Sequence, residues 1–211
     1  MAGDGSSGGA GRDACMTHDS PAEPDDHRQR PRTGVGWVLP YYDSIYGIVG
    51  ITRAHDELLR HADIHPGHRV LDIGCGTGAM ALRVKHTHPQ ATVVGLDPDQ
   101  PSLDRARRKA LAEGLDVQLD LGSAGSLPYA GDSVDRIVSA FAIHHLADDE
   151  RPRAYTEMLR VLSPTGSLHL MDFGRGDHLA TDLRDAGVRR GRLTRGSVVV
   201  ALPVTIVDAH P

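Results

Sequence analysis

The segment VLDIGCGTG, residues 70–78, decides the fold of this chain. Its first residues are aliphatic or β-branched, as in a buried strand, and Gly74, Gly76 and Gly78 follow at alternate positions. A helical stretch begins directly after the last glycine. A strand that runs through a glycine turn into a helix is typical of doubly wound α/β proteins, where the turn lets a nucleotide ligand approach the backbone closely.

A second acidic motif follows in VVGLDPD, where Asp97 lies nineteen residues after Gly78. A carboxylate at the end of the second strand of such a fold accepts hydrogen bonds from the ribose hydroxyls of a nucleotide. Asp97 is also a candidate for capping the next helix, and both roles are compatible. The spacing Gly74, Gly76, Ala79 fits the dinucleotide fingerprint as well, so the glycines leave a nicotinamide cofactor open.

Asp72 distinguishes between these ligands, because a carboxylate two residues before Gly74 would repel a pyrophosphate. A ligand with a cationic amino group would be attracted instead. Adenosine joined to an amino acid satisfies both ends, with its ribose on Asp97 and its ammonium near Asp72. The residues therefore favour S-adenosylmethionine as the cofactor.

The rest of the chain alternates short apolar runs with helical stretches. We expect strands at 69–73, 92–96, 117–121, 134–140 and 167–172, and a final pair near 188–193 and 197–207 that Arg195 and Gly196 connect as a hairpin. We expect helices at 52–62, 79–88, 101–112, 149–162 and 178–186, each stopped by a glycine or proline. Five βα units and a hairpin predict one α/β, Rossmann-like, doubly wound sheet.

Composition and charge limit the domain organisation and the function classes. With 211 residues and 39% hydrophobic content, the chain fits one domain. Residues 1–34 are rich in glycine, serine, aspartate, proline and arginine and have no apolar periodicity, so we expect a disordered tail there, then a helical lid segment at 35–64 and the main domain at 65–211. No signal peptide or transmembrane segment is evident, which favours the cytoplasm. Cys15 and Cys75 form no disulfide framework, and Cys75 is expected to be a packed residue.

Four ordered motifs resemble the class I S-adenosylmethionine-dependent methyltransferases, in the branch of the ubiquinone and menaquinone biosynthesis enzymes. VLDIGCGTG and VVGLDPD are similar to the first two motifs of that family, SLPYAGDSVDRIVSAFAIHHL to the third and fourth, and MLRVLSPTGSLHLMDF to the last helix and fifth strand. The resemblance covers residues 41–207. It implies the strand order 3-2-1-4-5-7-6 with strand seven antiparallel, and a cofactor across the carboxyl ends of strands one, two and four.

The resemblance also implies which residues meet the cofactor. Ala140 and Phe141 would line its methionine end, and the YYD at 41–43, with Tyr42 in contact, would close over it. The expected cofactor-binding residues are Tyr42, Asp72, Gly74, Gly76, Gly78, Asp97, Pro98, Ser123, Ala124 and Ala140.

The chain departs from the family at three places. Ser123 stands where many relatives have an acid for the adenine amino group, and weakens cofactor binding by on the order of 1 kcal/mol. SPTG at 163–166 replaces a turn in which Thr165 would be strained at positive φ, so the turn type is expected to differ. No helical lid fits between Phe173 and the next helix, so we expect an open acceptor side, roofed by residues 36–50 and completed by a second copy of the chain, a membrane surface or a large acceptor.

The chemistry is only partly readable from the sequence. His144 and His145 are the candidates for a base, since a neutral imidazole accepts a proton near pH 7, although packing of one and backbone capping by the other is the favoured explanation. The thirteen histidines lack metal-ligand spacing, so no metal is expected. The cluster Arg105, Arg107, Arg108 and Lys109 fits a solvated helix face, and the arginines within 175–195 suit an anionic headgroup better than nucleic acid, which is not expected as a partner.

The sequence therefore predicts a methyltransferase that acts from S-adenosylmethionine on a small or lipid-like acceptor. Two alternatives remain open at this point: an S-adenosylmethionine-binding module with weak or no catalysis, and a nicotinamide-dependent oxidoreductase.

Overall fold

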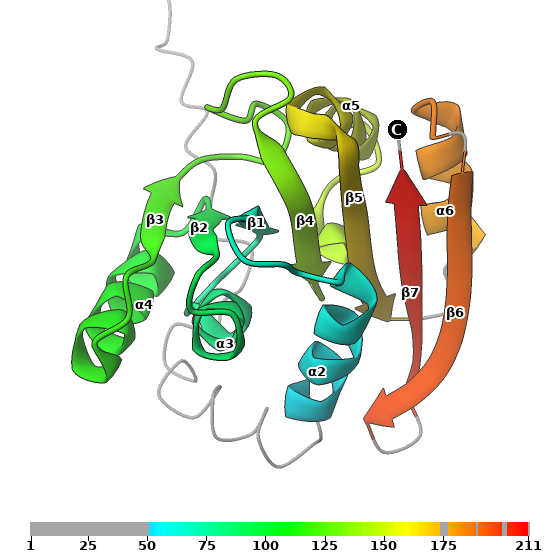
Figure 1. The fold of residues 1–211 in the computed structure, drawn as a ribbon. Helices are drawn as coiled ribbons and strands as arrows, with labels where there is room; N and C mark the ends of the chain where they lie inside the picture. Colours follow the sequence, from blue (N-terminus) through cyan, green and yellow to red (C-terminus); the bar gives the residue numbers. More distant parts are fainter. Residues whose placement is uncertain (1–50, 174–176, 189, 200–201, 211) are drawn as a thin grey trace, which may run out of the picture. The chain divides into compact units, whose positions relative to one another are not determined.

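The structure, a computed structural model, describes residues 51–173, 177–188, 190–199 and 202–210. Its seven strands form one sheet in the order β3-β2-β1-β4-β5-β7-β6 (Figure 1). The strands are β1 Arg69–Ile73, β2 Thr92–Asp97, β3 Gln118–Leu121, β4 Val134–Ala140, β5 Leu162–Phe173, β6 Arg190–Val199 and β7 Leu202–His210. β1 to β5 pair in parallel, and β7 is antiparallel to both β5 and β6. The predicted order and the antiparallel seventh strand are confirmed.

The helices cover both faces of the sheet, as a parallel sheet requires. They are α2 Ile51–Ala62, α3 Ala79–Thr87, α4 Gln100–Glu113, the short 3-10 turn η1 Ile143–His145, α5 Arg151–Val161 and α6 Asp177–Asp185. The helices predicted from the sequence agree with these bounds to within two residues. α2, α3 and α4 lie on one face, whereas α5 and α6 lie on the other (Figure 1).

Two apolar layers result, one on each side of the sheet. Leu168 and Leu170 of β5 join α5 and α6 in one layer, while Met171 joins α2 and α3 in the other. This alternation follows from the period of two in a strand. Successive residues of β5 therefore point in turn toward the α5–α6 layer and the α2–α3 layer.

The predicted position of the terminal hairpin turn is wrong. Arg195 and Gly196 lie inside β6, where they pair with Thr205 and Val204 of β7, and the strands are joined through 200–201, outside the described residues. A register shift between Ser197 and Val199 lies beside Pro203. Proline has no N–H to donate, and an irregular position of this kind is where a sheet accepts it.

The SPTG segment at 163–166 lies within β5 as an irregular insertion. The pairing of β5 with β4 moves from Leu162 opposite Val134 to Ser167 opposite Arg136. Among the described residues, the non-glycine positions with positive φ are Asp63, Asp132 and Phe141, so Thr165 avoids the strain that the expected turn would impose.

Other expectations concern parts of the chain that are not described. The tail at 1–34, the roof at 36–50 and the lid contact Tyr42 lie outside the described residues. Of the helices that are described, none is long and apolar enough to cross a membrane.

Candidate functional site

The glycine turn after β1 is held in place by the end of β2. The N–H groups of Gly74 and Cys75 both donate to the carbonyl of Leu96, over 2.8 and 3.1 Å. Gly78, at φ 83°, is the N-cap of α3, and its own N–H donates to the Cys75 carbonyl. The first turn of α3 therefore begins at the carboxyl end of the sheet, where open α/β folds bind their ligands.

The three glycines all have positive φ, but an added side chain would meet different surroundings at each. A Cβ at Gly74 would collide with the Cβ of Ala142, and one at Gly78 would lie 2.9 Å from the Cβ of Ala106 on α4. A Cβ at Gly76 would meet no described atom within 4 Å. Two of the glycines thus let neighbouring elements approach, and only Gly76 faces open space where a ligand can lie.

Asp97 ties the turn to the end of β2. Its Oδ2 accepts from the N–H of Gly76 over 2.7 Å, and its Oδ1 accepts from the N–H of Asp99 over 2.9 Å. Burial raises the pKa of this carboxyl, and the two backbone donors oppose that shift. The N-cap of α4 is Asp99, which accepts from Ser102 N, so the capping alternative for Asp97 is wrong.

Asp72 lies beneath the turn with only 1% of its surface exposed. The pKa of its carboxyl is raised from 3.8 to about 7, mainly by desolvation; a backbone hydrogen bond from Ala81 opposes this rise and the charge of Asp97 adds to it. Among the described residues, Oδ2 of Asp72 has no hydrogen-bond partner. A buried acceptor in this state gains from a cationic group brought to the turn.

The residues after β3 are brought to the same edge. The N–H of Gly122 donates to the Asp97 carbonyl over 3.1 Å, which holds the following turn near β2. Ser123 accepts from Gly125 N through its Oγ over 3.3 Å, and Ala124 is buried. Pro98, between Asp97 and Asp99, is exposed. The structure therefore gathers the described members of the expected set along the carboxyl ends of β1 to β4.

Two neighbours of the turn have structural roles. Lys109 Nζ on α4 donates to the carbonyl and Oγ1 of Thr77, and Arg107 donates to the Leu119 carbonyl. The basic cluster on α4 is thus not simply a solvated face. Cys75 is buried, and burial raises the pKa of its thiol, so it packs as expected and is not poised as a nucleophile.

An aromatic pair lies at the carboxyl ends of β4 and β5. Phe141 follows Ala140, takes φ 57° and donates its N–H to the Met171 carbonyl over 2.8 Å. Its ring stacks on Phe173 with the centroids 4.5 Å apart. Phe173 is 40% exposed, an unusual state for a large apolar residue at a functional edge. A strained, non-glycine positive φ beside it is also a feature of functional sites.

His144 is paired with an acid that the sequence reasoning missed. Its Nδ1 lies 2.6 Å from Oδ1 of Asp172, and its backbone N–H donates to Oδ2 over 2.8 Å. Asp172 is buried at the end of β5. The sequence held a usable signal, because adjacent parallel strands end at the same edge and an acid ends β5 where the two histidines follow β4.

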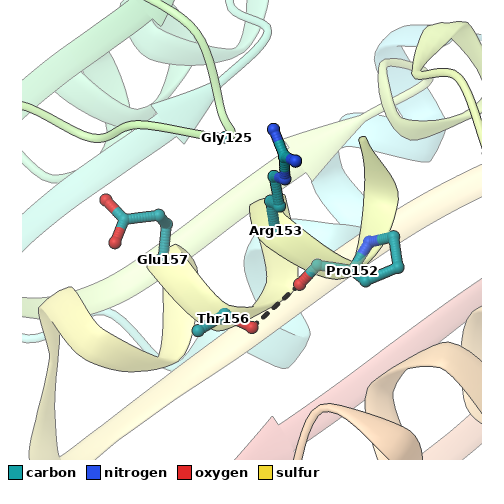
Figure 2. A pocket seen from close by; sticks show the side chains of 5 residues that line it. All are labelled: Gly125, Pro152, Arg153, Thr156 and Glu157. Carbon is teal, nitrogen blue, oxygen red and sulfur yellow. Dashed lines mark hydrogen bonds between the residues drawn. The ribbon is translucent and has the colours of Figure 1, made fainter. Parts of the chain in front are cut away.

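The described residues also line two hollows. One, of about 310 Å³, lies between Gly125 and the α5 residues Pro152, Arg153, Thr156 and Glu157 (Figure 2). The other, of about 670 Å³, is lined by residues that include His61, His169 and Asp208. Both histidines bond that carboxylate through Nδ1, over 2.7 and 2.8 Å. No group of three or more metal-ligating side chains occurs in the described part of the chain.

The edge of the sheet fits S-adenosylmethionine in two respects. The open space at Gly76 admits a ligand beside the backbone, next to a carboxylate, Asp97, that can accept from a ribose diol. The partnerless oxygen of Asp72 suits a cationic amino acid and would repel a pyrophosphate.

Comparisons with known proteins agree with this geometry. Residues 70–166 match the family model described as a methyltransferase domain. The chain is 37% identical over 139 residues to a demethylmenaquinone methyltransferase of Deinococcus radiodurans, covering 64% of this chain and 57% of that protein. It is 39% identical over 134 residues to the methyltransferase GfsG of Streptomyces halstedii, covering 61% and 47% of the two proteins.

The fold has solved counterparts as well. A crystal structure of an S-adenosylmethionine-dependent methyltransferase from Aquifex aeolicus superposes with a TM-score of 0.64 at 22% identity, over 74% of this chain and 89% of that one. The chain spans about half the length of the curated relatives it matches. The chain is therefore similar to methyltransferase domains over residues 70–166, and it shares the fold of the solved methyltransferase.

Proposed function

We propose that this chain transfers the methyl group of S-adenosylmethionine to a small or lipid-like acceptor that carries a flat apolar ring. The observation that carries the proposal is the stacked pair of Phe141 and Phe173, beside the cofactor turn, with Phe173 partly exposed. Aromatic rings favour flat apolar partners through offset or edge contacts. The printed name of the Deinococcus relative, a demethylmenaquinone methyltransferase, supports an acceptor of the quinone type.

The cofactor site in this proposal follows the carboxyl edge of the sheet. Asp97 accepts from the ribose hydroxyls, the backbone at Gly76 passes along the ligand, and Asp72 supplies the charge opposite the ammonium. Ser123 and Ala124 flank the adenine, and Ala140 the methionine end. Tyr42, outside the described residues, is the proposed lid contact.

The bound cofactor supplies an already activated methyl group. The protein then has to hold the acceptor in line with the carbon–sulfur bond and to keep water away. The proposed acceptor edge offers apolar surface for this at Phe141 and Phe173. An open acceptor side that a second copy of the chain or a membrane surface completes, and a cytoplasmic location, belong to the same proposal.

Calorimetric titration with S-adenosylmethionine tests the cofactor site through a matched pair of variants. Asp97→Asn removes the negative charge of the carboxylate that accepts hydrogen bonds from the ribose hydroxyls. Hydrogen bonds to a charged group contribute about 1.5–3 kcal/mol, so the affinity for S-adenosylmethionine should fall about 10- to 100-fold. Asp99→Asn makes the same change two residues away at the α4 cap, where asparagine serves equally well, so affinity should be retained.

Transfer of tritiated methyl groups into quinols, phenols and membrane lipid extracts then tests the activity. Incorporation into a ring-bearing small molecule or lipid is expected. Equal affinity in the two variants would refute the cofactor site, and cofactor binding without incorporation into any of these acceptors would favour a binding module.

A further inference from the structure

We propose that His144 is the general base of this site and that the acceptor reacts through an aromatic hydroxyl. The proposal deepens the proposed function and rests on it. It begins from the His144–Asp172 pair, which is not among the residues proposed above to bind the cofactor. A hydroxyl on an aromatic ring becomes a strong nucleophile only when its proton leaves, whereas a thiol ionises readily and a neutral amine already presents its lone pair.

Asp172 fixes the orientation of the imidazole. It accepts from Nδ1 of His144 over 2.6 Å, from the backbone N–H of His144 over 2.8 Å and from the N–H of Phe173 over 2.8 Å. With its proton on Nδ1, the neutral ring has its lone pair on Nε2. The carboxylate therefore sets both the tautomer and the direction of the basic nitrogen, as in other base–carboxylate pairs.

The burial of the two partners differs in the way such a base requires. The side chain of Asp172 is 8% exposed and that of His144 is 37% exposed. The acid is shielded from water, so its bond to the ring is strong, while the ring remains accessible to a ligand. A histidine that only packed against the sheet would be covered.

The pair also lies next to the cofactor turn and to the aromatic surface. His144 belongs to η1, which begins one residue after Ala142, and Ala142 is the residue that a Cβ on Gly74 would strike. The His144 ring stands edge-on to Phe173 with the centroids 5.6 Å apart. An aromatic acceptor on the exposed part of Phe173 thus lies beside the imidazole and near the turn.

The proton and electron balance is complete with these groups and the cofactor. The acceptor oxygen gives its proton to Nε2 and forms the bond to the methyl carbon. The carbon–sulfur bond breaks and its electron pair remains on sulfur, which becomes a neutral thioether. The imidazolium, stabilised by the Asp172 carboxylate, then releases the proton to water, so no oxidant or reductant is needed.

Two phenols of similar size separate base catalysis from a structural role. 4-Ethylphenol keeps its proton at about pH 8, whereas 4-nitrophenol has largely lost it, and general base catalysis contributes about 10²–10⁴-fold. His144→Gln in the full chain should therefore slow tritiated methyl transfer to 4-ethylphenol at least about 100-fold and to 4-nitrophenol less than about 10-fold. His65→Gln, the same change at an exposed histidine that pairs with Asp63, should alter neither rate more than about 3-fold.

Asp172→Asn tests the positioning role. It should lower kcat for 4-ethylphenol with little change in KM, and move the acid limb of the pH–rate profile, while S-adenosylmethionine affinity measured by calorimetry stays unchanged and shows an intact site.

The inference is overturned if His144→Gln slows both phenols equally or neither, or if the wild-type protein binds S-adenosylmethionine and methylates neither phenol. If the wild-type protein does not bind S-adenosylmethionine, the proposed function itself is overturned.

Discussion

Asp72 is a carboxyl group that water does not reach, and its pKa of about 7 makes stability depend on pH. The folded protein binds a proton at Asp72 between about pH 3.8 and 7 that the unfolded chain has already released. Stability from this group therefore falls as pH rises through that window. Above it, the ligand-free fold holds an uncompensated buried charge.

Asp72→Asn should remove this dependence. At about pH 8 the ligand-free variant should be more stable than the wild-type protein by about 2–4 kcal/mol, since each pKa unit corresponds to about 1.4 kcal/mol, and the difference should vanish near pH 4. Urea unfolding at both pH values measures it. The affinity of the variant for S-adenosylmethionine should fall at the same time. If the variant is no more stable than the wild-type protein at about pH 8, Asp72 does not carry a buried negative charge there.

Single residues were predictable from the sequence where one strand or turn decides their role. The positions of Asp72, Asp97 and Gly76 follow from the strand–turn–helix pattern. The separate reasons for Gly74 and Gly78 do not, because they depend on Ala142 and Ala106, which come from other elements. The pairing of Asp172 was not predicted for the same reason, because its partner, His144, lies twenty-eight residues earlier on another element.

At the scale of elements, α2 depends on a histidine that must remain neutral. His55 is buried on this helix beside the ring of Phe141, with the centroids 6.5 Å apart. Burial, helped by the charge of Arg83, lowers the pKa of His55 to about 4. Between pH 6.5 and 4 the unfolded chain binds a proton that the folded chain excludes, so acidification loosens α2.

His55→Leu should weaken this loss of stability on acidification. Between about pH 6.5 and 4 the wild-type protein should lose about 2–3 kcal/mol more than the variant, because 2.5 pKa units separate the folded and unfolded histidine. Urea unfolding across this range measures the difference. His65→Leu, at an exposed histidine that follows α2, is the control and should retain the wild-type slope.

Element boundaries were predictable where the chain carries local signals. Glycine and proline stops fixed the helices, and β1 and β4 match their predicted bounds in full. The hairpin failed because Arg195 and Gly196 look like a turn locally, while pairing with β7 extends β6 past them. β5 likewise absorbs residues 163–166, since its partner strand β4 sets the register on both sides of the insertion.

At the scale of the whole molecule, the tail and the lid segment should contribute differently to function. Removal of residues 1–34 should leave S-adenosylmethionine affinity and the urea midpoint unchanged, as expected for a segment without an apolar core. Removal of residues 1–50 should also remove Tyr42 and lower affinity about 10-fold, which corresponds to about 1.4 kcal/mol. Calorimetry on both proteins measures this, and equal affinities would exclude a lid role for 35–50.

Strand β5 ends with two neighbours that point to opposite faces of the sheet. Asp172 follows the direction of Leu168 and Leu170, and Phe173 that of Met171. Under the functions proposed above, the polar and the apolar parts of the acceptor edge are thus separate neighbours along one rigid backbone. Exchange of Phe173 for another side chain can change the shape of the accepted ring while the carboxylate stays in place.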